Sequence, residues 1–136
     1  MPASLRFVLL LSALGLLATP VAIYVIERQD SEQARITAEQ LTRGHVEAGK
    51  AAIARYACTA CHEIPGTADM QGKVGPSLKG IAVRTEIAGR LANSPDTMIR
   101  WIRHPQHVAP GNGMPEQGVT QADARDIAAY LYTLRR

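Results

Sequence analysis

The sequence predicts a small all-α domain preceded by an N-terminal transmembrane helix. Its 136 residues allow one domain of ordinary size. An uncharged apolar run covers residues 7–26, and the later segments show helix caps with apolar residues at helical spacing. No segment alternates regularly enough between apolar and polar residues to predict a strand.

The composition excludes several classes of protein. Lys and Arg number 15 against 12 Asp and Glu, and they are scattered along the chain, so we expect no nucleic-acid surface. The apolar fraction of 46% excludes disorder for most of the chain. The aromatic fraction of 4% is small for a core of this size, so another large apolar group is expected to fill it.

The run Phe7–Ile26 contains 20 residues without a charge. As a helix it would measure about 30 Å, the thickness of the hydrocarbon layer of a membrane. A cleaved signal peptide is the alternative, although its apolar region is normally shorter and ends at a clear small-x-small site. A cut near Val21 would leave apolar residues in water. Residues 1–26 are therefore predicted to be a membrane anchor, with the signal peptide as the alternative.

Residues 27–44 are predicted to form a polar stalk, and residues 45–136 the folded domain. The stalk has only Ile36 and Leu41 as large apolar residues, so it has no face of its own to bury. Its composition favours a solvated helix that would lift the domain about 27 Å.

The two cysteines lie in the pentapeptide Cys58-Thr59-Ala60-Cys61-His62, which has the CxxCH pattern of covalent haem attachment. In that chemistry each thiol adds to a haem vinyl group, and His62 becomes an axial ligand of the iron. A thioredoxin-like pair or half of a zinc site are the alternatives. No second cysteine pair completes a zinc site, and no strand-helix-strand pattern surrounds the motif. The sequence thus predicts one covalent haem c.

A second axial ligand is sought among the remaining methionines and histidines. The candidates are Met70, Met98, Met114, His45, His104 and His107. Met114 lies in Pro110-Gly111-Asn112-Gly113-Met114-Pro115, where glycines and prolines exclude helix and strand and hold the thioether on a constrained backbone. Met98 falls on a helical pattern and is predicted to be in the core, and Met70 lies in a polar loop. Met114 is the predicted ligand, with the histidines as nitrogen alternatives.

From Glu47 to Leu134 the chain resembles a class I cytochrome c. Gly49 and Ile53 match the N-terminal helix that packs on the C-terminal helix, where Tyr130 and Leu131 match the partner segment. The family usually has an aromatic residue in the place of Ile53. The segment from Asn93 to Pro105 is most similar to cytochrome c domains associated with haem-copper terminal oxidases.

The resemblance implies roles for two residues on the proximal side of the haem. Gly75-Pro76-Ser77-Leu78-Lys79-Gly80 is similar to the stretch whose proline carbonyl accepts a hydrogen bond from the proximal imidazole, here Pro76 and His62. Arg84 matches the arginine that neutralises a haem propionate.

Two further haem-site residues are implied by the same resemblance. Trp101 matches an aromatic residue over the haem near the methionine sulfur. The tryptophan that donates to a propionate in many family members has no counterpart here, and Asn93 stands near its place as a possible substitute donor.

Three helices are predicted in the domain. The first covers residues 45–57, the second 95–103, and the third begins at Thr120 with Asp123 as an acidic variant of the capping box. The residues expected to face the core are Val46, Ala52, Ile53 and Tyr56 in the first helix, and Ala124, Ile127, Ala128 and Leu131 in the third.

The predicted function is one-electron transfer from a quinol-oxidising complex to a terminal oxidase, without enzymatic activity or a small-molecule substrate. A fixed subunit of an oxidase is one alternative. A haem enzyme or sensor with an exchangeable sixth ligand is another, although such an enzyme would be expected to carry a second haem or a distal acid-base pair.

The family attaches haem on the outer side of the bacterial cytoplasmic membrane, so the domain is expected to face the periplasm. Arg6 precedes the apolar run and Arg28 follows it, which is the wrong order for the positive-inside rule. That rule weakens for long translocated segments. A positive rim for partner docking is expected at the haem edge, with a solvated basic face as the alternative. The residues of this rim are Lys73, Lys79, Arg100 and Arg103.

Overall fold

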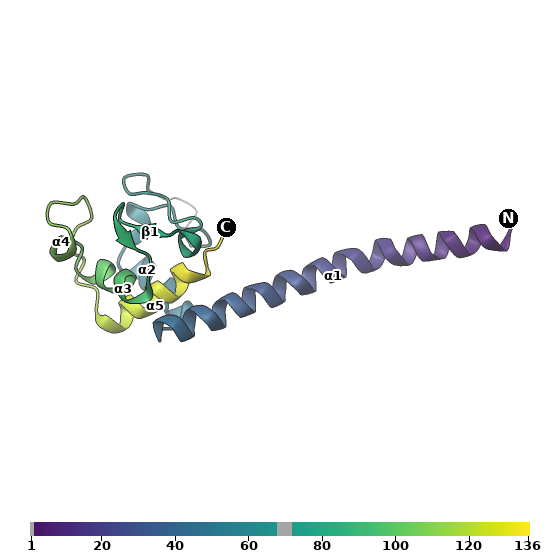
Figure 1. The fold of residues 1–136 in the computed structure, drawn as a ribbon, viewed down its shortest axis with the longest axis horizontal. Coiled ribbons are helices and arrows are strands. Elements are labelled where there is room, and N and C mark those ends of the chain that lie inside the picture. The colour runs from purple at the N-terminus through teal and green to yellow at the C-terminus, as the bar shows by residue number, and fades with distance from the viewer. Residues whose placement is uncertain (1, 68–71) are drawn as a thin grey trace. The chain divides into compact units, whose positions relative to one another are not determined.

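The computed structural model describes residues 2–67 and 72–136 and divides the chain into two compact units. The first unit ends at Gln33 and the second covers Ala34–Arg136. Helix α1 (Ala3–Thr42) begins in the first unit and ends in the second. Figure 1 shows the remaining helices gathered in the second unit. The predicted class, a mainly helical domain with an N-terminal apolar helix, is confirmed.

The first unit is a single helical segment, and none of its described side chains is buried. Its large apolar residues, among them Phe7, Leu16 and Ile23, are exposed on every side of the helix. Among the described residues there is one helix that is long enough and apolar enough to cross a membrane, and this helix is α1. Pro20 lies inside it, as tolerated in helices of this kind.

The second unit begins with the last turns of α1, which are packed against the domain. Ala38 is 1% exposed and Thr42 is 2% exposed, whereas the sequence led us to expect no buried face between residues 27 and 44. The difference arises because small side chains, and not large apolar ones, make this contact. The carboxylate of Glu39 also accepts a hydrogen bond of 3.0 Å from the backbone N–H of Val46, which lies at the start of the next helix.

The core of the second unit forms where α2 (Val46–Arg55) packs on α5 (Gln121–Thr133). A Cβ atom at Gly49 would overlap the backbone carbonyl oxygen of Asp126, so the two backbones meet closely at this glycine. The residues predicted to face the core are buried except Tyr56, which is partly buried against it. Ile53 is fully buried where the family usually has an aromatic residue.

Helix caps set the bounds of the other helices. Helix α3 (Pro95–Arg103) has the predicted bounds, with the Ser94 hydroxyl accepting from the Thr97 amide at its start, and α4 (Pro105–Val108) follows it. Helix α5 starts after Thr120, whose hydroxyl accepts from the Asp123 amide at 3.1 Å and donates to the Asp123 carboxylate at 2.8 Å. The predicted pair therefore caps the helix, with the Asp123 carboxylate bonded to the Thr120 hydroxyl where a standard capping box uses the backbone amide.

Two short strands form an antiparallel pair that the sequence did not predict. Strand β1 (Glu86–Ile87) pairs with β2 (Leu91–Ala92) across a turn in which Ala88 and Gly89 both have positive φ. Two residues are too few to show alternation, so this element has no periodic signal. Two single 3₁₀ turns, η1 (Cys58–Ala60) and η2 (Ile81–Val83), complete the described elements. The predicted helix 45–57 ends earlier, at Arg55.

The Asp123 carboxylate links the start of α5 to α2. Its hydrogen bonds predict that the stability of the fold decreases in acid. Hydrogen bonds from the hydroxyls of Tyr56 and Thr120, with the charge of Arg55, hold the pKa of this carboxyl below its usual range. A lowered pKa in the folded state means that the carboxylate stabilises the fold above its ordinary pKa of about 3.9. This contribution is lost as pH falls through the lower, folded-state pKa.

We expect Asp123→Asn to lower the melting temperature at neutral pH and to make its decline below about pH 4 less steep. Thermal unfolding followed by circular dichroism between pH 7 and about pH 2 measures both effects. If the melting temperatures of the variant and the wild type fell in parallel as the pH is lowered, the assignment would be contradicted.

Candidate haem site

The CxxCH motif lies on one tight turn that follows α2. Ala57 has a positive φ of 51°, and the turn is closed by backbone hydrogen bonds from Cys61 and His62 to the carbonyl of Cys58, at 3.2 and 3.0 Å. Both thiols are free and partly exposed. The turn thus presents the two cysteines and the histidine together.

The Cys58 thiol does not have the lowered pKa that is typical of a thiol-disulfide redox pair. Burial raises the pKa of the Cys58 thiol, and the neighbouring Cys61 adds to this effect. Redox-active CxxC pairs depend on a thiol whose pKa is lowered. Among the described residues, no group of three or more His, Cys, Asp or Glu side chains gathers to hold a metal ion. Neither the thioredoxin-like nor the zinc alternative is supported.

The imidazole of His62 is oriented by one hydrogen bond. Its Nδ1 lies 2.8 Å from the carbonyl oxygen of Pro76. A carbonyl only accepts, so Nδ1 is the donor and Nε2 is left as the nitrogen with a free lone pair for iron. A Cβ atom at Gly75 would overlap this ring, so the glycine makes room for the imidazole. The residues present therefore fit a haem with His62 as its axial ligand.

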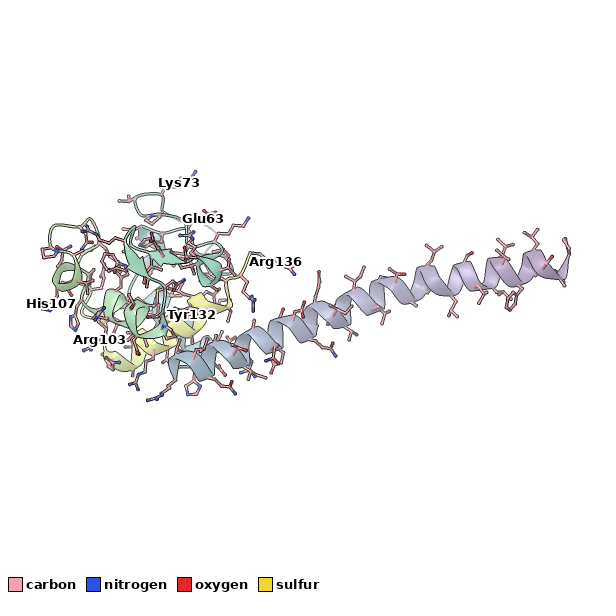
Figure 2. All side chains as sticks on the ribbon, in the orientation of Figure 1. Glu63, Lys73, Arg103, His107, Tyr132 and Arg136 are labelled. Carbon is pink, nitrogen blue, oxygen red and sulfur yellow. The ribbon has the colours of Figure 1, made fainter. Side chains whose placement is uncertain are left out.

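Backbone hydrogen bonds hold the proline loop against the motif. The amide of Gly72 donates to Thr59 at 2.7 Å, that of Gly75 to Cys61 at 2.8 Å, and that of Leu78 to Glu63 at 2.8 Å. Figure 2 shows Glu63 and Lys73, which belong to these two segments, on the same part of the second unit. The loop that carries Pro76 is thus tied along its length to the segment that carries His62.

Arg84 is bonded to the proline loop. Its Nη2 donates to the carbonyl oxygens of Ser77 and Lys79, at 2.7 and 2.8 Å. The guanidinium is exposed, and its other nitrogens have no hydrogen bond in the described structure. The propionate contact that the resemblance implies stays a prediction.

Asn93 is hydrogen-bonded through both ends of its carboxamide. Its Nδ2 donates to the carbonyl oxygens of Ile81 and Arg84, both at 2.8 Å, and its Oδ1 accepts from the hydroxyl of Tyr132 at 2.7 Å. Burial raises the pKa of Tyr132 to about 12, so this hydroxyl remains a donor. Both amide hydrogens of Asn93 are engaged by the backbone, and its direct role as a propionate donor stays a prediction.

Met114 lies between α4 and α5 on a stretch that forms neither helix nor strand, as predicted. Its backbone is bonded by two carboxamide side chains: the Asn112 Oδ1 accepts from its amide, and the Gln106 Nε2 donates to its carbonyl. The sequence analysis did not identify Gln106 or Asn112. The signal was the unpaired backbone of a loop without secondary structure, which needs side-chain partners.

The other candidate ligands are placed as follows. Met98 is buried in the core, as predicted, and Trp101 is partly buried against it. His104 and His107 are exposed, and His104 Nδ1 lies 3.8 Å from a carboxylate oxygen of Glu116. His45 is also exposed, just before α2, and Met70 lies outside the described residues.

The sequence pattern of the family described as cytochrome c matches residues 46–135. The chain belongs to the cytochrome c family. As a class I cytochrome c it binds one haem c covalently, as the single CxxCH motif predicts. The haem also supplies the large apolar group that the aromatic-poor composition requires.

Curated relatives of this cytochrome c belong to two kinds of protein. It is 35% identical over 92 residues to cytochrome c2 of Rhodopila globiformis, covering 57% of this chain and 83% of that protein. It is 31% identical over 98 residues to cytochrome c oxidase subunit 2 of Alkalihalophilus pseudofirmus, covering 71% of this chain and 28% of that protein. A third relative, cytochrome c oxidase subunit 2 of Bacillus sp. (strain PS3), is 28% identical over 88 residues. The chain thus spans about a quarter of the length of the two oxidase subunits.

Proposed function

We propose that this cytochrome c is a membrane-anchored carrier that takes electrons from a quinol-oxidising complex and passes them to a terminal oxidase. The observation that carries the proposal is the orientation of His62, whose Nδ1 is held by the Pro76 carbonyl so that Nε2 keeps its lone pair for an iron ligand bond. The apolar helix supports anchoring, and the similarity to two oxidase subunits supports the acceptor.

In this proposal the protein's own residues fill the coordination positions of the haem iron, so that no substrate can bind there. Cys58 and Cys61 would hold the haem through thioether bonds, and His62 Nε2 and the Met114 sulfur would be the protein's two ligands to its iron. The bound haem supplies an iron that cycles between Fe(III) and Fe(II). A Met/His pair leaves no position for oxygen or peroxide and raises the reduction potential, since the soft thioether favours Fe(II).

The domain is proposed to face the periplasm, where the positive rim would steer partners. Lys73, Lys79 and Arg100 are exposed, whereas Arg103 is partly buried and donates to the Gln121 carboxamide at 2.6 Å. Three exposed cations and one hydrogen-bonded cation give a modest field, so steering of partners should weaken as salt increases.

A fixed subunit of an oxidase is the second candidate function. It is favoured by the 31% identity to a cytochrome c oxidase subunit 2. The two candidates differ in whether the protein leaves the oxidase after extraction. Purification of the solubilised oxidase at moderate salt separates them, because a subunit stays bound in fixed stoichiometry and a carrier does not.

The proposal is tested in membranes that contain the full-length protein. We expect the haem to remain in the membrane after high-salt and carbonate washing, and to be reduced by added quinol. Oxygen should then reoxidise it, and cyanide, which blocks the terminal oxidase, should prevent this. Release of the haem into the wash would contradict anchoring, and reoxidation that ignores cyanide would contradict the acceptor.

A further inference from the structure

We propose that Gln106 is a positioning residue for Met114. The side-chain amide of Gln106 fixes the loop that presents the methionine sulfur. The inference rests on the proposed function, in which Met114 is the sixth ligand of the haem iron. It adds a residue that the family resemblance did not supply.

The carboxamide of Gln106 makes three hydrogen bonds, all to the backbone of this loop. Nε2 donates to the carbonyl oxygens of Asn112 and Met114, at 2.8 and 2.7 Å, and Oε1 accepts from the amide of Gly111 at 3.1 Å. One side chain thereby replaces the backbone partners that a helix or strand would give to residues 111–114.

Asn112 adds a second layer of hydrogen bonds to the same loop. The hydrogen bonds made by the side chains of Gln106 and Asn112 are together termed the clamp. Its Nδ2 donates to the carbonyl oxygens of Pro105 and Ala109, at 2.8 and 2.7 Å, and its Oδ1 accepts from the amide of Met114 at 2.7 Å. The backbone N–H and C=O of Met114 are therefore both bonded to carboxamides. Since Gln106 also holds the carbonyl of Asn112, the two layers are connected.

The backbone of Gln106 is itself held in place by its neighbours. It follows Pro105, which is fully buried, and its own amide donates to the Glu116 carboxylate at 3.0 Å. Helix α4, which carries it, packs on α3. Figure 1 shows α4 and its loop at one side of the second unit, and Figure 2 places His107, the next residue, there.

The clamp has a consequence for the iron. The backbone of Met114 can move away from the metal only if hydrogen bonds made by Gln106 and Asn112 break. Removing the clamp raises the fraction of protein in which the sixth position is open. An external ligand that needs this open form then binds with a lower apparent dissociation constant, because that constant is inversely proportional to the open fraction.

The experiment titrates the ferric holoprotein with imidazole and records the weak charge-transfer band that marks iron-sulfur ligation in this family. We expect Gln106→Ala to weaken the band and to lower the apparent dissociation constant of imidazole by about tenfold, the effect of one net hydrogen bond of about 1.4 kcal/mol. Gln106→Leu keeps the side-chain bulk and carries the same expectation if the alanine variant does not fold.

Gln117→Ala is the matched control. Gln117 is exposed in the same loop and makes no hydrogen bond in the described structure. The charge-transfer band and the imidazole affinity of the Gln117→Ala variant should therefore equal those of the wild type. A lower melting temperature for the Gln106 variants without a change in imidazole affinity would overturn the positioning role alone. A wild type that lacks the band and binds imidazole readily would instead overturn the assignment of Met114, and the inference with it.

Discussion

Replacement of Met114 by alanine is expected to open the haem iron while leaving the fold in place. The thioether is the soft ligand that favours Fe(II), so its loss should lower the reduction potential and give the iron a site for water or an added ligand. The loop itself should persist, because its hydrogen bonds come from the side chains of Gln106 and Asn112 and from the backbone of residue 114, and not from the methionine side chain.

Three readouts test this expectation in purified Met114→Ala. The ferric charge-transfer band should disappear, the potential measured by redox titration should fall, and the ferrous protein should bind carbon monoxide. Met98→Leu is the control, because Met98 is buried in the core and a swap of similar volume usually costs less than about 1.5 kcal/mol. Survival of the band in Met114→Ala, with its loss in His104→Ala or His107→Ala, would assign the ligand to a histidine.

Replacement of Gly49 by alanine is expected to destabilise the whole haem-binding unit. The added Cβ would overlap the backbone carbonyl of Asp126, and a backbone carbonyl in the middle of α5 has no freedom to turn aside. The two helices must separate, and the side chains between them, such as Ile53 and Ala128, lose their contacts. We expect a loss of about 3 kcal/mol or more in the free energy of unfolding, at the upper end of the range for overpacking.

Denaturant unfolding of the oxidised protein measures the effect. Gly15→Ala is the matched control, since it adds the same methyl group to a helical glycine with nothing within 4 Å of the new atom. It should leave the unfolding midpoint unchanged. Equal midpoints for Gly49→Ala and the wild type would show that α2 and α5 are not packed as closely as the structure indicates.

The parts of the fold that the sequence predicted correctly depend on local chemistry. Helix α3 has its predicted bounds because Ser94 caps it and Pro105 follows its end. The start of α5 was predicted because Thr120 and Asp123 make a capping box within one turn. The cofactor was predicted because the reaction of two thiols and an adjacent imidazole with haem needs the spacing of Cys58, Cys61 and His62.

The parts that the sequence did not predict depend on contacts between distant or very short segments. The last turns of α1 pack on the domain through Ala38 and Thr42, which a search for large apolar residues does not detect. Strands β1 and β2 are too short for a periodic pattern. The bonds from Gln106 to the Met114 loop join a side chain to backbone atoms up to eight residues away, and amino-acid spacing carries no trace of them.

The central claim, that both axial positions of the iron are filled by the protein, is tested most directly by adding carbon monoxide to the reduced wild-type protein. The absorption spectrum before addition should be that of a ferrous haem c. We predict that it does not change on addition of carbon monoxide, because His62 and Met114 occupy the iron. A prompt shift to the spectrum of a carbon monoxide complex would contradict the account and favour an enzyme or sensor with an exchangeable sixth ligand.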